Sequence, residues 1–450
     1  MKKILVFIFA VFLSGCAVKS INEDYSKLIL DENLSLNFEF EQEWWKGYER
    51  AELNELVRLA LKNNTNLLKA AININKALAQ AGIVSANLIP NFNANFTSDI
   101  SKNLEGGSLS KSYKSGISLN YEIDLWQKLA NSRDAAFWEF NATKFDAEAT
   151  RLALINSVVD SYFEIAYLNE SLELYKAALK NYIKLEVITK AKFELGKGEE
   201  LSLKQIQSSL LNAQNRILTA QKNLNSVKQT LRILLAEGPE FEFKFTSFSF
   251  DDIKFLGVNL DVPLYAIANR PDLKAAIARI EENLLNVKVS QKSFYPSVNI
   301  GASLSGSGDQ ANEAFSLKFF GGNLSLNLPF LNYSRLQNNL KISEANFELA
   351  KIGYFETLIK ALNELDTAYK NLKNDSALLI NYEKQSVNFK EISEIYKLKF
   401  DAGKGELKDY LQARNNELDA RSNLILQRYK ILQDEINIYK AMAGRAKLKQ

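Results

Sequence analysis

Histidine is absent from this 450-residue chain, and cysteine, methionine and proline occur only one, two and six times. Without histidine the chain lacks the commonest general base and the commonest metal ligand, which argues against an enzyme or a zinc site. The single cysteine excludes an internal disulfide. With only 19 glycines and 6 prolines, long helices are favoured. We therefore expect a largely helical protein that is not an enzyme and carries no cofactor.

A strong excess of charge of one sign is also missing. The 56 basic and 53 acidic side chains leave a formal charge of +3, or +1 without Lys2 and Lys3. No basic excess suggests a nucleic-acid partner. The acidic residues are scattered over helical segments without a convergent nucleophile, base and oxyanion donor, so we interpret them as solvated. Because methionine stands only at 1 and 442, few soft ligands are present for copper or silver.

The N-terminus has the pattern of a secretory signal. A basic start precedes an apolar run at 4–13, and the letters LSGC end at Cys16. We interpret 1–15 as a signal peptide. The LSGC ending resembles the lipobox of bacterial lipoproteins, in which the cysteine becomes the lipidated N-terminus, and Ala17 after it favours the outer membrane by that resemblance. A plain signal peptide with a chance cysteine is the alternative.

A hexapeptide at 193–198, FELGKG, recurs as FDAGKG at 400–405. In both places a long helical pattern meets two glycines and a new helical pattern follows. Glycine accepts the left-handed conformation that closes a helix, so each copy predicts a tight helix-to-helix hairpin. The recurrence predicts a duplicated architecture.

Each half has the order helix, strand pair, very long helix, glycine turn, helix. A first helix is expected over 52–88, and the uninterrupted pattern at 132–195 would reach roughly 95 Å at ~1.5 Å per residue. Apolar residues spaced by seven in the final helix of each half predict coiled-coil packing. Apolar residues that alternate with Asn or Ser predict the strands. The resulting division is an extended lipidated segment (16–50), a first repeat (51–237, strands about 91–99 and 115–124), a connector (238–260), a second repeat (261–443, strands about 297–306 and 315–328) and a C-terminal tail (444–450).

Four strands of this length suit a bilayer crossing, because a tilted transmembrane strand needs ~9–11 residues. Two soluble hairpins that cap a helical bundle are the alternative. Open sheet edges are not tolerated in lipid, so the strands need other copies of the chain. Three copies give twelve strands, an even number wide enough to be hollow. The predicted fold is mainly α with a transmembrane β-barrel portion, a trimer that forms a 12-stranded β-barrel on a coaxial α-helical barrel.

With this duplicated pattern the chain resembles the TolC/OprM-type outer-membrane factor family over nearly its whole mature length. The resemblance rests on the Gly-Lys-Gly turns and on ANLIP at 86–90, SFYP at 293–296 and YEIDLW at 121–126. It implies a homotrimer in outer-membrane lipid that extends into the periplasm. There it would dock with a periplasmic adaptor and an inner-membrane transporter, giving drugs or other small solutes a passive exit.

In that family the glycine turns meet the adaptor, and nearby side chains ring a closable aperture. Carried over residue by residue, the docking candidates are Gly196, Lys197, Gly198, Gly403, Lys404 and Gly405. The candidates for the periplasmic gate are Lys408, Asp409 and Gln412. Relatives often place an apolar residue where Lys408 stands and an acid where Gln412 stands. A solvated helix face is the alternative for each gate residue, and turn geometry alone is the alternative for the glycines.

Two other functions stay open at this point. One is an outer-membrane channel for protein secretion, because the adaptor and the pump choose the cargo. The other is a coiled-coil scaffold lipoprotein without a pore, which explains the heptads but not the four alternating segments.

Overall fold

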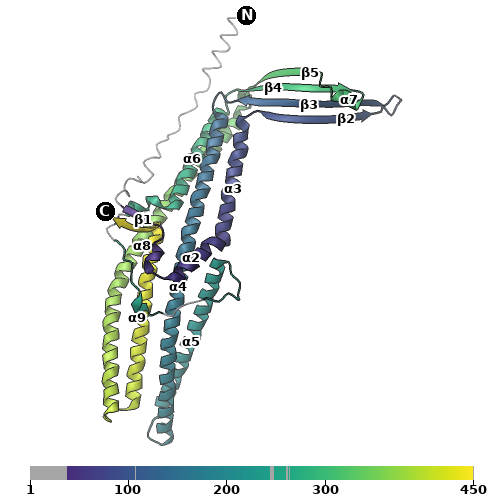
Figure 1. Cartoon of the computed structure of the whole chain (residues 1–450). Coiled ribbons are helices and arrows are strands. Elements are labelled where there is room, and N and C mark those ends of the chain that lie inside the picture. Colours follow the sequence, from purple (N-terminus) through teal and green to yellow (C-terminus); the bar gives the residue numbers. More distant parts are fainter. Residues whose placement is uncertain (1–37, 107, 244–247, 260–261, 263, 449–450) are drawn as a thin grey trace. The chain divides into compact units, whose positions relative to one another are not determined.

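The computed structural model describes residues 38–448 except for 107, 244–247, 260–261 and 263 (Figure 1). Each half of the chain contains helices, an antiparallel strand pair, a very long helix and a second long helix. The α-helices are α2 (Ala51–Asn63), α3 (Thr65–Ser85), α4 (Lys128–Glu194), α5 (Glu200–Leu235), α6 (Pro271–Lys292), α7 (Ala311–Ala314), α8 (Tyr333–Asp401) and α9 (Leu407–Ala441). The strands are β1 (Phe38–Glu41), β2 (Asn91–Ser101), β3 (Ser110–Ile123), β4 (Ser297–Gly308), β5 (Phe319–Asn327) and β6 (Arg445–Leu448). Short 3-10 helices lie at η3 (Trp44–Tyr48), η4 (Ala86–Leu88), η5 (Phe250–Asp252), η6 (Leu264–Asn269) and η7 (Pro329–Asn332).

The chain forms two compact units, and both contain parts of each sequence repeat. The strand unit comprises Ala71–Asp146 and Asp272–Leu358 among the described residues. The hairpin unit comprises the described residues up to 70, Ala147–Pro271 and the chain from Ile359 onward. The compact units therefore do not coincide with the predicted repeats at 51–237 and 261–443, because α4 and α8 each contribute to both units.

Helices α4 and α8 are long because little in their sequences stops them. They contain 67 and 69 residues, or about 100 Å each at 1.5 Å per residue. Proline occurs in neither, and Gly353 in α8 is the one glycine in the pair. Each ends at a Gly-Lys-Gly turn, where a left-handed residue closes the helix.

The helix expected over 52–88 is instead divided at Asn64, which has φ −57° and ψ 125°. Its side-chain oxygen accepts hydrogen bonds from the backbone N–H groups of Asn66 (3.0 Å) and Leu67 (3.1 Å), so it caps α3. Its amide donates to the carbonyl of Leu234 at the end of α5, 2.9 Å away. The break is therefore stabilised by a partner far along the sequence.

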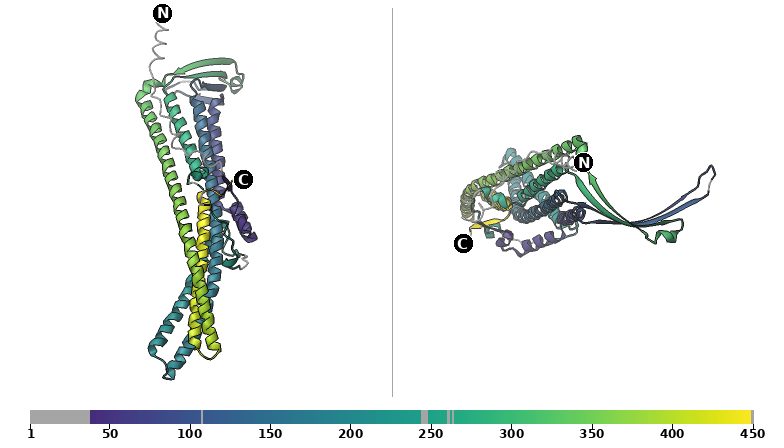
Figure 2. Two further views of the ribbon diagram at one scale, coloured as in Figure 1. Left: turned by 90° about the vertical axis from the view of Figure 1, so that its left-hand side faces the viewer. Right: turned by 90° about the horizontal axis from the view of Figure 1, so that it is seen from above.

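The strand unit contains one four-stranded antiparallel sheet in the order β2-β3-β4-β5. The central pair, β3 and β4, joins the two halves of the chain, with Asn120 opposite Gly301 and Ile117 opposite Leu304. In this unit the sheet extends away from the ends of the helices (Figures 1 and 2). Below it, small and apolar side chains form the helical core; these include Ala81, Ala142, Ala278, Val287, Phe347 and Tyr354.

Strand β5 begins at Phe319, later than the start predicted near 315, because α7 and the residues after it fold back onto the sheet. Ser115 Oγ donates to the Ala314 carbonyl at 2.7 Å. A Cβ on Gly306 would lie 2.1 Å from that carbonyl oxygen, so the fold-back needs glycine there. The rings of Phe315 and Phe96 stack with centroids 5.3 Å apart. These contacts hold the loop on β2, β3 and β4.

The hairpin unit has a core built from segments far apart in sequence. Trp44 packs on Tyr439 with ring centroids 5.0 Å apart, and Tyr48 meets Phe163 at 4.9 Å. Leucine, valine and isoleucine side chains of α2, α4, α5 and α9 complete the cluster. Strand β6, within the predicted C-terminal tail, pairs antiparallel with β1, and Gln42 Nε2 donates to the Ala443 carbonyl at 2.9 Å. Both ends of the described chain are thus fixed to each other.

Candidate channel wall and docking surfaces

The strand register sorts side chains by chemistry onto the two faces of the sheet. Residues directly opposite each other in antiparallel strands share a face. One face consists mainly of rows such as Phe92, Leu119, Ala302 and Gly322, or Ala94, Ile117, Leu304 and Phe320. The other consists mainly of rows such as Asn91, Asn120, Gly301 and Asn323, or Asn93, Ser118, Ser303 and Gly321. We call these the apolar face and the amide face.

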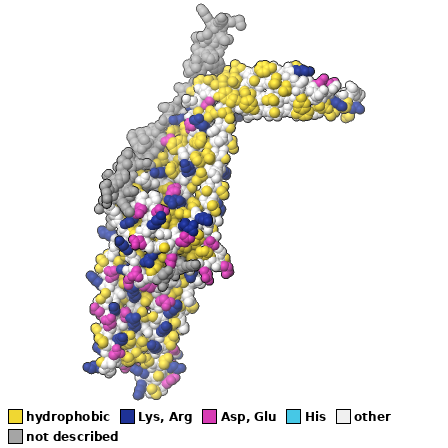
Figure 3. Space-filling model, viewed as in Figure 1, with side chains coloured by type: hydrophobic (Ala, Val, Ile, Leu, Met, Phe, Trp, Pro, Cys, Tyr) yellow, Lys and Arg dark blue, Asp and Glu magenta, His cyan; other side chains and the backbone are white. Residues whose placement is uncertain are grey.

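The apolar face is uncovered over most of its area. Phe92 is 69% exposed, Phe320 81% and Leu324 74%. Figure 3 shows hydrophobic side chains gathered over the strands. Contiguous exposed apolar surface of this kind marks a contact with lipid or with another protein. Here it lies on strands of 9–14 residues, a length that suits a tilted membrane crossing.

Both edges of this sheet are open. Among the described residues neither β2 nor β5 has a second strand partner. Their outward backbone N–H and C=O groups form a template for pairing with another chain. In lipid such edges must be closed, because no water is present to satisfy the backbone groups.

Helices of the strand unit also leave apolar stripes exposed. On α3, Ile72 and Ile83 are 65% and 71% exposed. On α8 the exposed side chains recur at helical spacing; they are Ile342, Leu349, Ile352 and Phe355. Helices with such stripes on their solvent side need further helices to cover them.

The YEIDLW segment forms the junction between β3 and α4. The Asp124 carboxylate accepts hydrogen bonds from the N–H groups of Leu129 (3.0 Å) and Ala130 (2.8 Å), which have no partner inside the helix. Trp126 Nε1 donates to the Pro296 carbonyl at 2.7 Å, and its ring stacks on Tyr295. Two of the recognised sequence motifs therefore meet at this junction.

The predicted docking glycines close two nearly identical turns in the hairpin unit. Gly196 and Gly403 both have φ +67°. Lys197 N–H donates to the Lys192 carbonyl, and Lys404 N–H to the Lys399 carbonyl, each at 2.8 Å. This pattern is the Schellman motif, in which a left-handed glycine ends the helix.

The second glycine of each turn has a different role. A Cβ on Gly198 would lie 3.2 Å from the Phe193 nitrogen, and one on Gly405 would lie 3.1 Å from Lys399 Cβ. Close approach to the last helical turn therefore favours glycine at both positions. Lys197 and Lys404, between the glycines, are exposed.

The gate candidates Lys408, Asp409 and Gln412 are all exposed in the first turns of α9. Their spacing places them on one face of the helix, whereas Leu411 next to them is buried. Cys16, the predicted lipidation site, lies outside the described residues.

Sequence reasoning missed a set of polar contacts between the two helical hairpins of this unit. Lys192 Nζ lies 2.6 Å from Glu406 Oε2, which lowers the pKa of the Glu406 carboxyl through that hydrogen bond and the lysine charge. Arg216 on α5 pairs with Asp419 on α9 at 2.6 Å. Two neutral contacts, Asn181 with Asn415 at 2.9 Å and Ser422 with Tyr175 at 3.2 Å, lie along the same seam. No local pattern in the sequence signals these partners.

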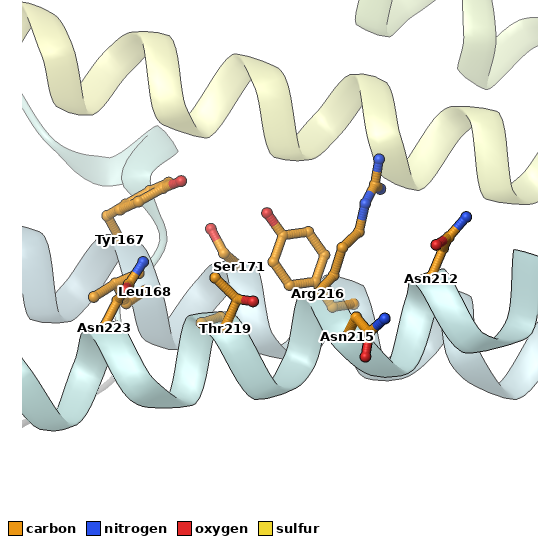
Figure 4. A pocket seen from close by; sticks show the side chains of 10 residues that line it. Tyr167, Leu168, Ser171, Asn212, Asn215, Arg216, Thr219 and Asn223 are labelled. Carbon is orange, nitrogen blue, oxygen red and sulfur yellow. The ribbon is translucent and has the colours of Figure 1, made fainter.

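The grooves of the hairpin unit are open and lined by both polar and apolar groups. One of about 460 Å³ lies along α4 and α5, lined by Tyr167, Leu168, Ser171, Tyr175, Asn212, Asn215, Arg216, Thr219, Ala220 and Asn223 (Figure 4). Side chains from the two helices line this groove, and Arg216 reaches from it toward α9. Eight of the ten lining residues carry an amide, hydroxyl or guanidinium group.

Among the described residues, we find no helix that combines the length and the apolar composition needed to cross a membrane. In the same part of the chain, no three acidic, cysteine or histidine side chains gather in a way that could hold a metal ion.

Comparisons with known proteins identify relatives over nearly the whole chain. The family described as "Outer membrane efflux protein" matches residues 56–237 and 262–444. Toxin and drug export protein A of Aggregatibacter actinomycetemcomitans is 36% identical over 98% of both chains. The pyoverdine export outer membrane protein OpmQ of Pseudomonas putida is 26% identical over 90% of this chain and 88% of its own. The Campylobacter jejuni CmeC outer membrane channel superposes with a TM-score of 0.80 at 25% identity, covering 97% of this chain and 95% of that one.

The chain belongs to the outer membrane efflux protein family. It is an efflux channel of the bacterial outer membrane. The predicted resemblance and the predicted fold class are confirmed. The predicted outer-membrane location is confirmed by the relatives named as outer-membrane proteins.

Proposed function

We propose that three copies of this chain close the sheet into a 12-stranded barrel and pack their helices into a coaxial tunnel. The resulting duct is the outer-membrane part of a tripartite efflux system, with a periplasmic adaptor and an inner-membrane transporter as partners. Drugs or other small solutes leave through it passively, driven by the transporter. Lipidation at Cys16 anchors each copy in outer-membrane lipid.

The single observation that carries this proposal is the open amphipathic sheet. Within the described part of the chain it has two unpaired edges, β2 and β5, and one exposed apolar face. Pairing β2 of one copy with β5 of the next closes the edges and turns the apolar face to lipid. At the same contact between copies, the exposed apolar stripes of α3 and α8 pack against helices of the neighbouring copy.

Conductance in planar bilayers tests the duct. The purified trimer should give discrete single-channel steps, whereas a scaffold lipoprotein without a pore should give none. Ala94→Asp is the variant for comparison with the wild type. A charge on the apolar face costs free energy at the lipid contact, so this variant should insert into the bilayer less than the wild type does. A protein of trimeric mass that never conducts would overturn the proposal.

We assign adaptor docking to the turns at Gly196, Lys197, Gly198 and Gly403, Lys404, Gly405, and the periplasmic aperture to Lys408, Asp409 and Gln412. The exposed lysines and the duplicated geometry of the turns support the first assignment, and the shared exposed face of α9 supports the second. Bulky residues at Gly196 and Gly403 should impair pump assembly more than trimer formation. Unchanged drug resistance in cells that depend on this double variant would contradict the docking assignment.

A second cargo class is favoured by one observation. The relative at 36% identity is named for export of both toxin and drugs. We therefore keep protein secretion through the same duct as a candidate. Loss of a secreted protein from the culture medium on deletion of the gene, with drug resistance unchanged, would favour it over small-solute efflux.

A further inference from the structure

The amide face is nearly free of charge. Apart from Phe319, its positions on β2 to β5 are Asn, Ser, Thr or Gly, with three charged exceptions: Asp99, Lys114 and Glu122. Glu122 lies 2.6 Å from Lys128 at the start of α4. Asp99 and Lys114 occupy diagonal positions on adjacent strands, where opposite charges interact favourably. Each charge on this face therefore has an opposite charge nearby: Lys128 of α4 for Glu122, and a diagonal position for Asp99 and Lys114.

Between these pairs lie three consecutive rows without any charged side chain. They are Asn95, Gly116, Ser305 and Phe319; Asn93, Ser118, Ser303 and Gly321; and Asn91, Asn120, Gly301 and Asn323. If the apolar face meets lipid, as in the proposed trimer, these rows face the lumen. Each row then recurs three times around the barrel.

The amides of the last row converge on a glycine. A Cβ on Gly301 would lie 2.2 Å from Asn323 Oδ1 and 3.3 Å from Asn120 Oδ1. The space above Gly301 is therefore occupied by amide groups from both neighbouring strands. Amide and hydroxyl groups can donate and accept hydrogen bonds without favouring either sign of charge.

Resting on the duct proposed above, we propose that this amide collar makes the strand section of the duct indifferent to the sign of solute charge. The collar comprises the three uncharged rows. It offers hydrogen bonds to any polar group, so cationic, anionic, zwitterionic and uncharged solutes cross it comparably. Charged pores, in contrast, concentrate one sign of solute ~10–10³-fold through their local potential.

The chain offers a direct test because Cys16 is its only cysteine. Asn120→Cys places a thiol in the collar, and cationic and anionic methanethiosulfonate reagents of equal size then report the local potential. After correction for their rates with a free small thiol, the two reagents should react within about threefold of each other. Ser303→Cys, on the neighbouring row, gives a second reading if the first variant folds poorly.

Matched variants calibrate the result. Adding Ser118→Asp to Asn120→Cys introduces one charge per chain and should favour the cationic reagent about tenfold or more. Ile117→Cys on the apolar face should react with neither reagent.

Conductance of the same samples separates the two proposals. A conducting trimer whose collar thiols react at rates differing by more than about threefold, or do not react at all, overturns the amide collar and leaves the duct intact. A trimer that does not conduct refutes the duct itself.

Discussion

Replacement of Gly403 tests whether the closing turns depend on backbone conformation. Gly403 has φ +67°, and a Cβ there would meet no atom within 4 Å. Any effect of Gly403→Ala is therefore conformational rather than steric. For a residue with a side chain the left-handed region costs roughly 1–2 kcal/mol. Because 1.4 kcal/mol corresponds to a factor of ten, the turn should open about 5–30 times more often.

Hydrogen exchange of the Lys404 amide measures this opening. In the native turn that N–H donates to the Lys399 carbonyl at 2.8 Å. Exchange should accelerate by the factor given above in Gly403→Ala and more in Gly403→Val, since β-branched residues tolerate positive φ least. Gly403→Asn should be mildest, because asparagine visits the left-handed region routinely.

A helical glycine supplies the control. Gly82 lies within α3 with no neighbour near its Cβ position. Gly82→Ala should therefore stabilise its helix by about 0.5–1 kcal/mol and slow local exchange. Equal exchange at Lys404 in the Asn, Ala and Val variants would refute the conformational argument.

Four further predictions concern other parts of the chain. Asp124→Ala removes the carboxylate that caps α4 and should lower stability by about 1 kcal/mol, with Asp124→Asn intermediate in a thermal melt. Burial, with a neighbouring carboxylate, raises the pKa of Glu282 to about 7. The contribution of the protonated side chain to the free energy of unfolding is therefore fully present below the unfolded-state pKa near 4.5 and is lost as pH rises to about 7. The melting temperature should fall over that range in the wild type and less in Glu282→Gln; identical pH profiles would contradict this. Lys192→Glu should enlarge the change in conductance between closed and open single channels. Adding Glu406→Lys should return that change to the wild-type value if the 2.6 Å contact between these residues holds the hairpins together. Cys16→Ser should abolish palmitate labelling but not trimer formation, and labelling that persists would exclude the lipobox.

Much of the fold could be predicted because its signals are local. Asparagine alternates with apolar residues from Asn91 to Phe96, and this period of two predicts a strand whose faces differ. The turns at Gly196 and Gly403 require a residue in the left-handed conformation, and a glycine at the end of a helical pattern in the sequence predicts such a turn.

Other features depend on partners that lie far away in sequence. The break at Asn64 contains neither proline nor glycine, and its stabilising contact with Leu234 is 170 residues away. The fold-back of α7 depends on the missing side chain of Gly306 meeting the Ala314 carbonyl. A single sequence pattern does not contain such pairings.

The same limit applies to the candidate sites. The docking glycines could be located because two turns share one hexapeptide. The contact between Lys192 and Glu406 could not, since both residues lie among many similar charges and are 214 positions apart. The sequence shows the alternation of polar and apolar residues that produces the amide collar. The rows of the collar can be assigned only from the register of the four strands.

The pairing of β1 with β6 sets the order in which the molecule can be completed. Phe38 of β1 pairs with Leu448 of β6. Strand β1 therefore has no partner strand until nearly the whole chain has been made and exported. A chain truncated after Ala443 would leave β1 as an open edge. This pairing therefore makes completion of the hairpin unit depend on both ends of the described chain, because β1 without β6 has unpaired backbone groups on both of its edges.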